Sequence, residues 1–249
     1  MTEKQRVVIK VGTSTLTYET GKINIRRIEL LSQVISDLNH SGREVVLVSS
    51  GAVGVGTSKL GFAKRPGSTR EKQAASAVGQ SELMSMYGKF FAEFGCQVAQ
   101  ILITKNVLED EERRINAVNA FRTLLDWHVV PIVNENDVIS TAEIEFGDND
   151  TLSAVVAELI GADLLIILSD IDGLFDKDPS VHEDAKLIPE VREVTETLMK
   201  SAGGAGTNRG TGGMVTKLIA AKSAMQAGVD MVIINGSNPK AIYDILEGK

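Results

Sequence analysis

The sequence has few of the residues that most often build disulfides and metal centres. It contains one cysteine, Cys96, and three histidines, His40, His128 and His182, in 249 residues. A single cysteine cannot form a disulfide within the chain or a thiolate cage around zinc. The histidines lie far apart without metal-ligand spacing, so we expect them at the surface or at its boundary with the core. Cys96 is expected in the interior as a small apolar side chain.

Positive charge and long apolar runs are also scarce. There are 26 Lys and Arg against 33 Asp and Glu, which gives a net charge of −7. This balance argues against general nucleic-acid binding, because contacts to phosphates need clustered cations. The apolar runs 129–133 and 164–168 are much shorter than the roughly 20 residues of a membrane-spanning helix. No apolar leader follows Met1, so we expect a cytoplasmic protein that binds neither membrane nor nucleic acid.

Segments typical of strands and of amphipathic helices alternate along the whole chain. This alternation predicts an α/β protein with βαβ units and a mainly parallel sheet covered on both faces. Apolar runs predict the strands, and apolar positions at helical spacing predict the helices. The expected strands are 6–11, 44–50, 97–104, 129–134, 164–169 and 231–234. The expected helices lie between Asn24 and Gly42, at 69–94, from the charged segment 109–114 through Leu125, and at 150–160, 214–226 and 239–246.

The chain shows neither a linker nor an internal repeat, so we expect one domain over 1–249. The character of the segments changes near Gly147, which is compatible with two lobes that share one sheet. Residues 138–146 alternate β-branched and acidic side chains, and we expect a hairpin there that projects from the sheet edge. Six glycines in the eleven residues 203–213 predict a functional or mobile loop. Trp127 is expected to pack at the end of a helix.

The first candidate functional segment is Lys10-Val11-Gly12-Thr13-Ser14, at the end of the first strand. A lysine at the carboxyl end of a parallel strand, followed by a turn of small residues, suits a phosphate-binding crevice. A solvated lysine before an ordinary turn explains the same residues.

The second segment, 49–56, reads SSGAVGVG and follows the second strand. Its glycines can open a helix whose first N–H groups hold an anion. The order of the glycines is the reverse of the dinucleotide-binding pattern G-x-G-x-x-G, so we reject that assignment. Glycines that only allow close packing of a helix on the sheet remain the alternative.

The third candidate consists of two clusters of Asn and Asp. One is 134–137 (NEND), at a strand end, and the other is 147–150 (GDND), at a helix start. Together they offer donors and acceptors that suit an α-amino group and a carboxylate. Helix capping accounts for single residues of the second cluster but not for both clusters.

Two further segments suit a nucleotide. Residues 169–175 (SDIDGLF) place a hydroxyl and a carboxylate at a strand end, although turn chemistry favours the same residues. Residues 210–217 (GTGGMVTK) let the backbone approach a polyphosphate and place Lys217 in the first turn of a helix. This segment does not match the Walker A pattern, and a flexible glycine linker is its alternative explanation.

Two lysines in glycine-rich segments, two Asn/Asp clusters and no paired nucleophile favour phosphoryl transfer. Such a reaction depends mainly on positioning and charge neutralisation. A carboxylate acceptor is already ionised at neutral pH, so it needs no general base.

Six segments together resemble the amino acid kinase family, and within it the members that phosphorylate L-glutamate. They are KVGTSTL (10–16), VSSGAVGVG (48–56), VNEND (133–137), FGDND (146–150), LSDIDGLFDKDP (168–179) and GTGGMVTK (210–217). The resemblance covers essentially the whole chain, and the segments occur in the order found in the family. It implies an open αβα sandwich that uses Mg²⁺ and ATP to phosphorylate the γ-carboxylate of L-glutamate, the first step of proline biosynthesis.

The resemblance also implies a role for each matching residue. Lys10 and Lys217 neutralise the transferring phosphoryl group, and Asp150 organises both lysines. The residues expected to hold or assist glutamate are Ser50, Gly51, Asn134, Asp137, Asp148 and Asn149. The residues expected to bind ATP are Lys10, Ser169, Asp170, Thr211, Gly212, Gly213, Met214, Val215, Thr216 and Lys217. No residue is assigned as a metal ligand.

The resemblance further implies a homo-oligomer, a dimer or tetramer, that proline inhibits by feedback. The amino acid is expected in a lobe of about 1–147 and the nucleotide in a lobe of about 148–249. Many family members continue into a PUA domain, and none is expected in this chain. The alternatives are a kinase of the same family that acts on N-acetylglutamate or aspartate, and a non-catalytic sensor of an amino acid or nucleotide.

Overall fold

The computed structural model describes residues 5–18, 20–140, 149–177, 179, 181–203 and 213–248. The strands are β1 (Arg6–Val11), β2 (Glu44–Ser49), β3 (Val98–Ile103), β4 (Val130–Glu135), β5 (Leu164–Ser169) and β6 (Asp230–Asn235). The helices are α1 (Thr13–Leu16), α2 (Ile25–His40), α3 (Ala52–Lys59), α4 (Thr69–Glu93), the short 3-10 helix η1 (Lys105–Leu108), α5 (Glu111–Asp126), α7 (Asn149–Ile160), α8 (Glu196–Gly203), α9 (Met214–Gln226) and α10 (Ala241–Leu246). None of these helices is both long and apolar enough to span a membrane.

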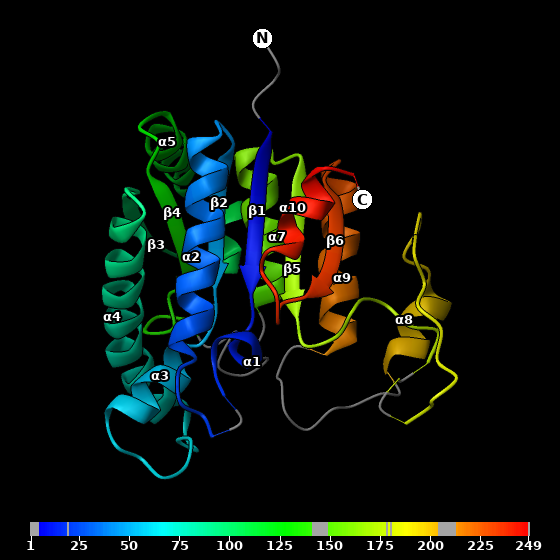
Figure 1. Cartoon of the computed structure of the whole chain (residues 1–249), viewed down its shortest axis with the longest axis horizontal. Coiled ribbons are helices and arrows are strands. Elements are labelled where there is room, and N and C mark those ends of the chain that lie inside the picture. Colours follow the sequence, from blue (N-terminus) through cyan, green and yellow to red (C-terminus); the bar gives the residue numbers. More distant parts are fainter. Residues whose placement is uncertain are drawn as a thin grey trace.

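The described strands form one sheet in the order β3-β4-β2-β1-β5-β6, and every pairing between neighbours is parallel. All six predicted strands are therefore confirmed within one or two residues at each end. Because the strands are parallel, their carboxyl ends meet at one edge of the sheet. In Figure 1 this edge is at the bottom, where the strand arrows point, beside α1 and α3.

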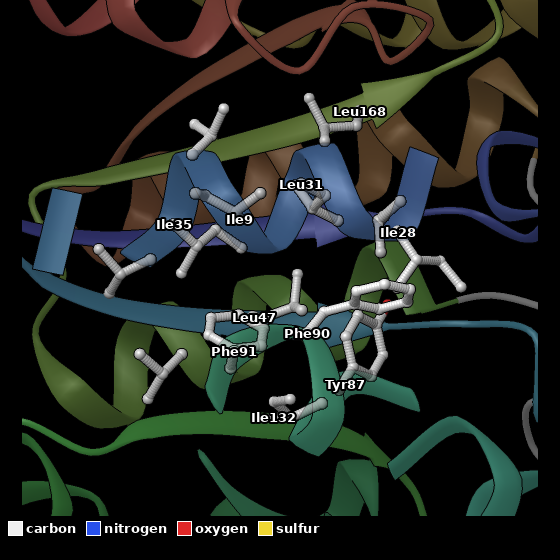
Figure 2. Close-up of a cluster of buried hydrophobic side chains, with 14 of the residues drawn as sticks. Ile9, Ile28, Leu31, Ile35, Leu47, Tyr87, Phe90, Phe91, Ile132 and Leu168 are labelled. Carbon is white, nitrogen blue, oxygen red and sulfur yellow. The ribbon is translucent and has the colours of Figure 1, made fainter. Parts of the chain in front are cut away.

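Helices cover both faces of the sheet, as the alternation of segments predicts. Figure 1 shows α2, α4 and α10 in front of the sheet and α5, α7 and α9 behind it. The front layer packs Ile28, Leu31 and Ile35 of α2 and Phe91 of α4 onto the strands (Figure 2). The rear layer is a second core that includes Val8 of β1. This double coverage explains why the strands of the sheet are apolar on both faces.

Local signals set the ends of several helices. The side chain of Asn24 accepts a hydrogen bond from the backbone N–H of Arg27 at 3.2 Å, which caps α2 as predicted. A capping box between Ser68 and Glu71 opens α4. Gly42 has φ of +93°, a left-handed conformation that suits the end of α2.

Two glycines let α3 and α4 approach each other closely. A Cβ on Gly56 would lie 1.8 Å from the carbonyl oxygen of Ala75, and one on Gly79 would lie 1.8 Å from that of Ala52. Since no side chain tolerates such a distance, both positions require glycine. This contact fixes the start of α3 against the middle of α4, next to the carboxyl edge of the sheet.

Some local expectations need correction or lie outside the described residues. The segment after Lys10 is not only a turn, because residues 13–16 form the short helix α1. Trp127 ends α5 but is 69% exposed, so it does not pack there. Residues 137–139 form a turn, and the rest of the predicted hairpin, 141–146, lies outside the described residues. Cys96 is buried as expected, and His40, His128 and His182 are exposed.

Candidate active site

Lys10, Asp150 and Lys217 meet at the carboxyl edge of the sheet. Lys10 lies near the end of β1, Asp150 in the first turn of α7 and Lys217 in the first turn of α9. The Nζ of Lys10 lies 2.5 Å from Oδ1 of Asp150, and the Nζ of Lys217 lies 3.2 Å from Oδ2. Their exposed fractions are 6%, 0% and 5% for Lys10, Asp150 and Lys217. Buried charges of this kind are stable only when they are paired.

The environment of Asp150 keeps its carboxylate ionised. Burial by itself raises the pKa of this group, but the ammonium groups of Lys10 and Lys217 outweigh burial and lower the pKa to about 2. The hydroxyl of Thr216 adds a hydrogen bond to Oδ2 at 3.0 Å. The three charged groups therefore carry one net positive charge, which can attract a phosphoryl group.

The two Asn/Asp clusters come into direct contact, as their placement predicts. The Nδ2 of Asn149 donates to Oδ1 of Asn134 at 2.7 Å and to the backbone oxygen of Ser49 at 3.2 Å. The Nδ2 of Asn134 in turn donates to Oε1 of Gln80, on α4, at 2.8 Å. Asn134, Asn149 and Gln80 are all buried. These bonds join α4, β2, β4 and α7 at one point of the sheet edge.

Asp137 lies in the turn that follows β4 and is also buried. The hydroxyl of Ser76, on α4, donates to its Oδ2, while Oδ1 has no hydrogen-bond partner among the described residues. Burial raises the pKa of Asp137, and the carboxylate of Glu135 raises it further, whereas the Ser76 hydroxyl and Arg65 lower it. A carboxylate placed in this way gains most from a cationic group of a ligand.

Ser50 and Gly51 lie between this polar cluster and the start of α3. Ser50 is buried, and its backbone N–H donates to the backbone oxygen of Val11 at 3.0 Å. Gly51 has φ of +105° and immediately precedes α3, so the helix begins here as the glycine-rich motif predicts. Gly51 also lines a cavity of about 530 Å³ whose described lining includes three basic residues, Lys22, Lys64 and Arg65, and no acidic one.

A second cavity, of about 420 Å³, lies beside Lys217 and has the volume of a typical small-molecule site. Five of the predicted ATP-binding residues line it: Ser169, Asp170, Gly213, Met214 and Lys217. Apolar side chains that include Leu174, Phe175, Ile188 and Leu198 cover part of its wall. The cavity therefore combines apolar side chains with the hydroxyl of Ser169, the carboxylate of Asp170 and the ammonium group of Lys217.

Most of the predicted site residues lie at this one edge of the sheet. Val215 and Thr216 belong to the first turn of α9, next to Lys217. Three predicted residues, Asp148, Thr211 and Gly212, lie outside the described residues. Among the residues that the structure describes, no three His, Cys, Asp or Glu side chains are grouped as a metal site.

Sequence reasoning missed residues that come from helices remote in the chain. Ser76 and Gln80 lie four residues apart on α4 and are both buried. The only signal in the sequence was a pair of polar side chains at helical spacing within a helix expected to pack on the sheet. Thr195, Leu198 and Ser201, which lie in or just before α8, line the second cavity. The apolar spacing of 196–203 was a usable signal for α8, which we did not predict.

Comparisons with known proteins agree with this architecture. The amino acid kinase family model matches residues 5–235. A glutamate 5-kinase of Clostridium perfringens is 57% identical over 99% of this chain and 93% of its own length. A glutamate 5-kinase of Clostridium tetani is 52% identical over 98% and 92%.

Among solved structures, a carbamate kinase from Giardia lamblia bound to AMP-PNP superposes with a TM-score of 0.67. It is 19% identical, and the match covers 100% of this chain and 97% of that one, which establishes the shared fold. The six-stranded parallel sheet with helices on both faces is the expected αβα sandwich. The match of the family model and the identity to the two relatives lead to one conclusion: the chain belongs to the amino acid kinase family.

Proposed function

We propose that this chain transfers the γ-phosphoryl group of ATP to the γ-carboxylate of L-glutamate, forming L-glutamyl 5-phosphate and ADP. The observation that carries the proposal is the sharing of the Asp150 carboxylate by Lys10 and Lys217, which come from opposite ends of the chain. The choice of substrate is supported by two relatives named glutamate 5-kinase that are more than half identical to this chain.

In the proposed reaction a γ-carboxylate oxygen attacks the γ-phosphorus, and the bond from that phosphorus to the β–γ bridging oxygen breaks. The electron pair of this bond leaves with ADP. Lys10 and Lys217 neutralise the charge of the transferring group, and Asp150 holds both ammonium groups in place. The attacking carboxylate carries no proton at neutral pH, so no general base takes part.

The amino acid occupies the polar cluster in the half of the sheet formed by β1, β2, β3 and β4. Asp137 receives the α-ammonium group, which suits its buried and partly unpartnered carboxylate. Ser50, Gly51, Asn134, Asp148 and Asn149 complete this site. In this proposal residues 1–147 supply most of the amino acid site.

The nucleotide occupies the second cavity, within residues 148–249. Ser169, Asp170, Gly213, Met214 and Lys217 line this cavity, and Lys217 also pairs with Asp150. Lys10, Thr211, Gly212, Val215 and Thr216 complete the set of ATP-binding residues that the family pattern implies. The start of α9 then faces the phosphates, where the helix dipole favours negative charge.

Magnesium enters the proposal only as the ion that accompanies ATP. The carboxylate of Asp150 is engaged by two lysines, and no cluster of protein ligands for a cation occurs among the described residues. These residues do not form a cage for Mg²⁺, which commonly binds through substrate phosphates and water. No catalytic step is assigned to the ion. A cytoplasmic location, a homo-oligomer and feedback inhibition by proline follow from the family resemblance.

A hydroxylamine-trapping assay tests the function, because an acyl phosphate yields a hydroxamate from any carboxylate acceptor. The purified chain is supplied with Mg-ATP and with L-glutamate, L-aspartate or N-acetyl-L-glutamate. We expect hydroxamate from L-glutamate alone. Hydroxamate only from another acceptor would keep the phosphoryl transfer and refute the substrate, whereas no product from any acceptor would favour a non-catalytic sensor.

A further inference from the structure

One face of α4 contacts the polar segment that follows β4. Ser76 donates a hydrogen bond to Oδ2 of Asp137, and Oε1 of Gln80 accepts one from Nδ2 of Asn134 at 2.8 Å. Ser76 and Gln80 are four residues apart, so they lie on the same face of the helix. Both are buried. Two uncharged polar side chains are thus aimed at two residues of the amino acid site.

The same site contains two buried acceptors that lack partners. Oδ1 of Asp137 and Oδ1 of Asn149 have no hydrogen-bond partner among the described residues. Buried polar atoms are almost always satisfied, so two exceptions in one cluster point to a ligand that supplies donors. An ammonium group has three donors and no acceptor, which matches this pair of oxygens.

Ser76 and Gln80 determine which atoms remain open. The hydroxyl of Ser76 occupies Oδ2 of Asp137, so Oδ1 is the oxygen left for a ligand. Gln80 engages the NH₂ group of Asn134, and Oδ1 of Asn134 therefore accepts from Nδ2 of Asn149 at 2.7 Å. Because the NH₂ group of Asn149 donates to Asn134, its Oδ1 is the atom that remains for a ligand.

We infer that Ser76 and Gln80 are positioning residues that aim the Asp137 and Asn149 oxygens at the α-ammonium group of the substrate. They thereby select an amino acid with a free amine. The inference rests on the proposed function and adds two residues of α4 to it. An N-acylated substrate brings one N–H donor and a carbonyl acceptor, so it satisfies these oxygens less well. Ser76 and Gln80 themselves contact protein groups rather than the reacting atoms.

The test compares L-glutamate with glutarate, which has both carboxylates but no amine. We would measure the KM of L-glutamate, the KM of ATP and the inhibition constant of glutarate for the wild type, Ser76→Ala and Gln80→Leu. Each substitution should raise the glutamate KM about 10-fold and leave the ATP KM and the inhibition constant of glutarate within about 2-fold of the wild type. Ser76→Ala removes a hydrogen bond to the Asp137 carboxylate, and Gln80→Leu removes one to Asn134, which orients Asn149.

Gln73 provides a matched control on the same helix. Its Nε2 donates to the backbone oxygen of Val138 at 3.3 Å, so Gln73→Ala removes a contact to the same segment without touching either open oxygen. We expect this variant to keep the wild-type ratio of the glutarate constant to the glutamate KM. Thermal unfolding checks that each variant is folded, and Ser76→Cys or Gln80→Met replaces one that is not.

The outcomes separate the inference from the function on which it rests. Equal losses for glutamate and glutarate would mean that α4 only supports the site, and they would overturn the inference. An unchanged glutamate KM in both variants would overturn it as well. A wild type that forms no product from glutamate would overturn the proposed function together with this inference.

Discussion

Replacing Asp150 by Asn should both destabilise the protein and nearly abolish its activity. The substitution keeps the size of the side chain but removes the negative charge that Lys10 and Lys217 share. Both lysines are at most 6% exposed, so water cannot replace the carboxylate. Two buried ammonium groups then repel each other without their common counter-charge.

The expected magnitude follows from two independent considerations. The pKa of Asp150 falls from 3.8 to about 2 in the folded chain, which corresponds to about 2 kcal/mol in favour of the ionised form. Removal of one partner from a buried ion pair typically costs about 3–5 kcal/mol. We therefore expect Asp150→Asn to lose about 2–5 kcal/mol of unfolding free energy. Activity should fall at least about 100-fold in kcat, since the lysines lose their positions.

The pH dependence gives a second signature of the same interaction. Because the folded-state pKa of Asp150 lies below its unfolded value, its contribution to stability is present above about pH 4. That contribution is lost as the pH falls from about 4 through about 2. The difference in stability between wild type and Asp150→Asn should therefore shrink over the same interval.

Urea unfolding at several pH values and steady-state kinetics at neutral pH measure both effects. Asp230→Asn is the matched control, because Asp230 is exposed at the start of β6, at the opposite edge of the sheet. The control should stay within about 0.5 kcal/mol of the wild type. The proposed role of Asp150 between Lys10 and Lys217 would be refuted if Asp150→Asn matched the control in stability and kept kcat within about 2-fold.

Three further predictions concern Lys217, the Asp137 carboxylate and the contact between α3 and α4. Lys217→Ala should lower kcat at least about 100-fold, because the transferring phosphoryl group loses one neutralising charge. Calorimetry should find the glutamate affinity of this variant within about 3-fold of the wild type. An unchanged kcat would exclude the proposed role of Lys217. Asp137→Ala should raise the glutamate KM far more than the ATP KM. Burial raises the pKa of Asp137, so this carboxylate should become protonated at a higher pH than an ordinary carboxyl group. The glutamate KM of the wild type should therefore begin to rise at that higher pH as the solution is acidified. A glutamate KM that stayed constant down to pH 4 would contradict this. Gly79→Ala should cost about 3 kcal/mol or more in thermal unfolding because its Cβ meets the backbone of Ala52, whereas Gly88→Ala, with open space around it, should be neutral or stabilising.

The layered fold could be predicted because its signals are local. Strand 164–169 and helix 214–226 have the predicted bounds, since a strand buried on both faces is a continuous apolar run and an amphipathic helix repeats every three or four residues. The lysines and carboxylates of the site were also predictable, because parallel strands bring their ends to one edge. Each of these residues also lies in a short segment rich in Gly, Asn or Asp, which marked it as a candidate.

Contacts between remote helices could not be predicted in the same way. Ser76 and Gln80 reach Asp137 and Asn134 because α4 packs against α3 through Gly56 and Gly79. Nothing near positions 76 and 80 in the sequence shows which residues they face. The exposure of Trp127 is a related failure, because a helix end can leave a large side chain in solvent when no neighbouring element covers it.

Strand and helix periodicity together explain how one helix start serves both candidate sites. Val7, Ile9 and Val11 of β1 face the front core, so Lys10 faces the rear layer, where α7 begins. In that first turn, Asn149 and Asp150 are consecutive, and consecutive helical residues point about 100° apart. Asn149 therefore contacts the amino acid cluster while Asp150 contacts the two lysines. Because the backbone fixes this angle, a shift of α7 that moved Asn149 would also move Asp150. The position of α7 therefore couples the proposed amino acid site to the charges of the proposed phosphoryl site.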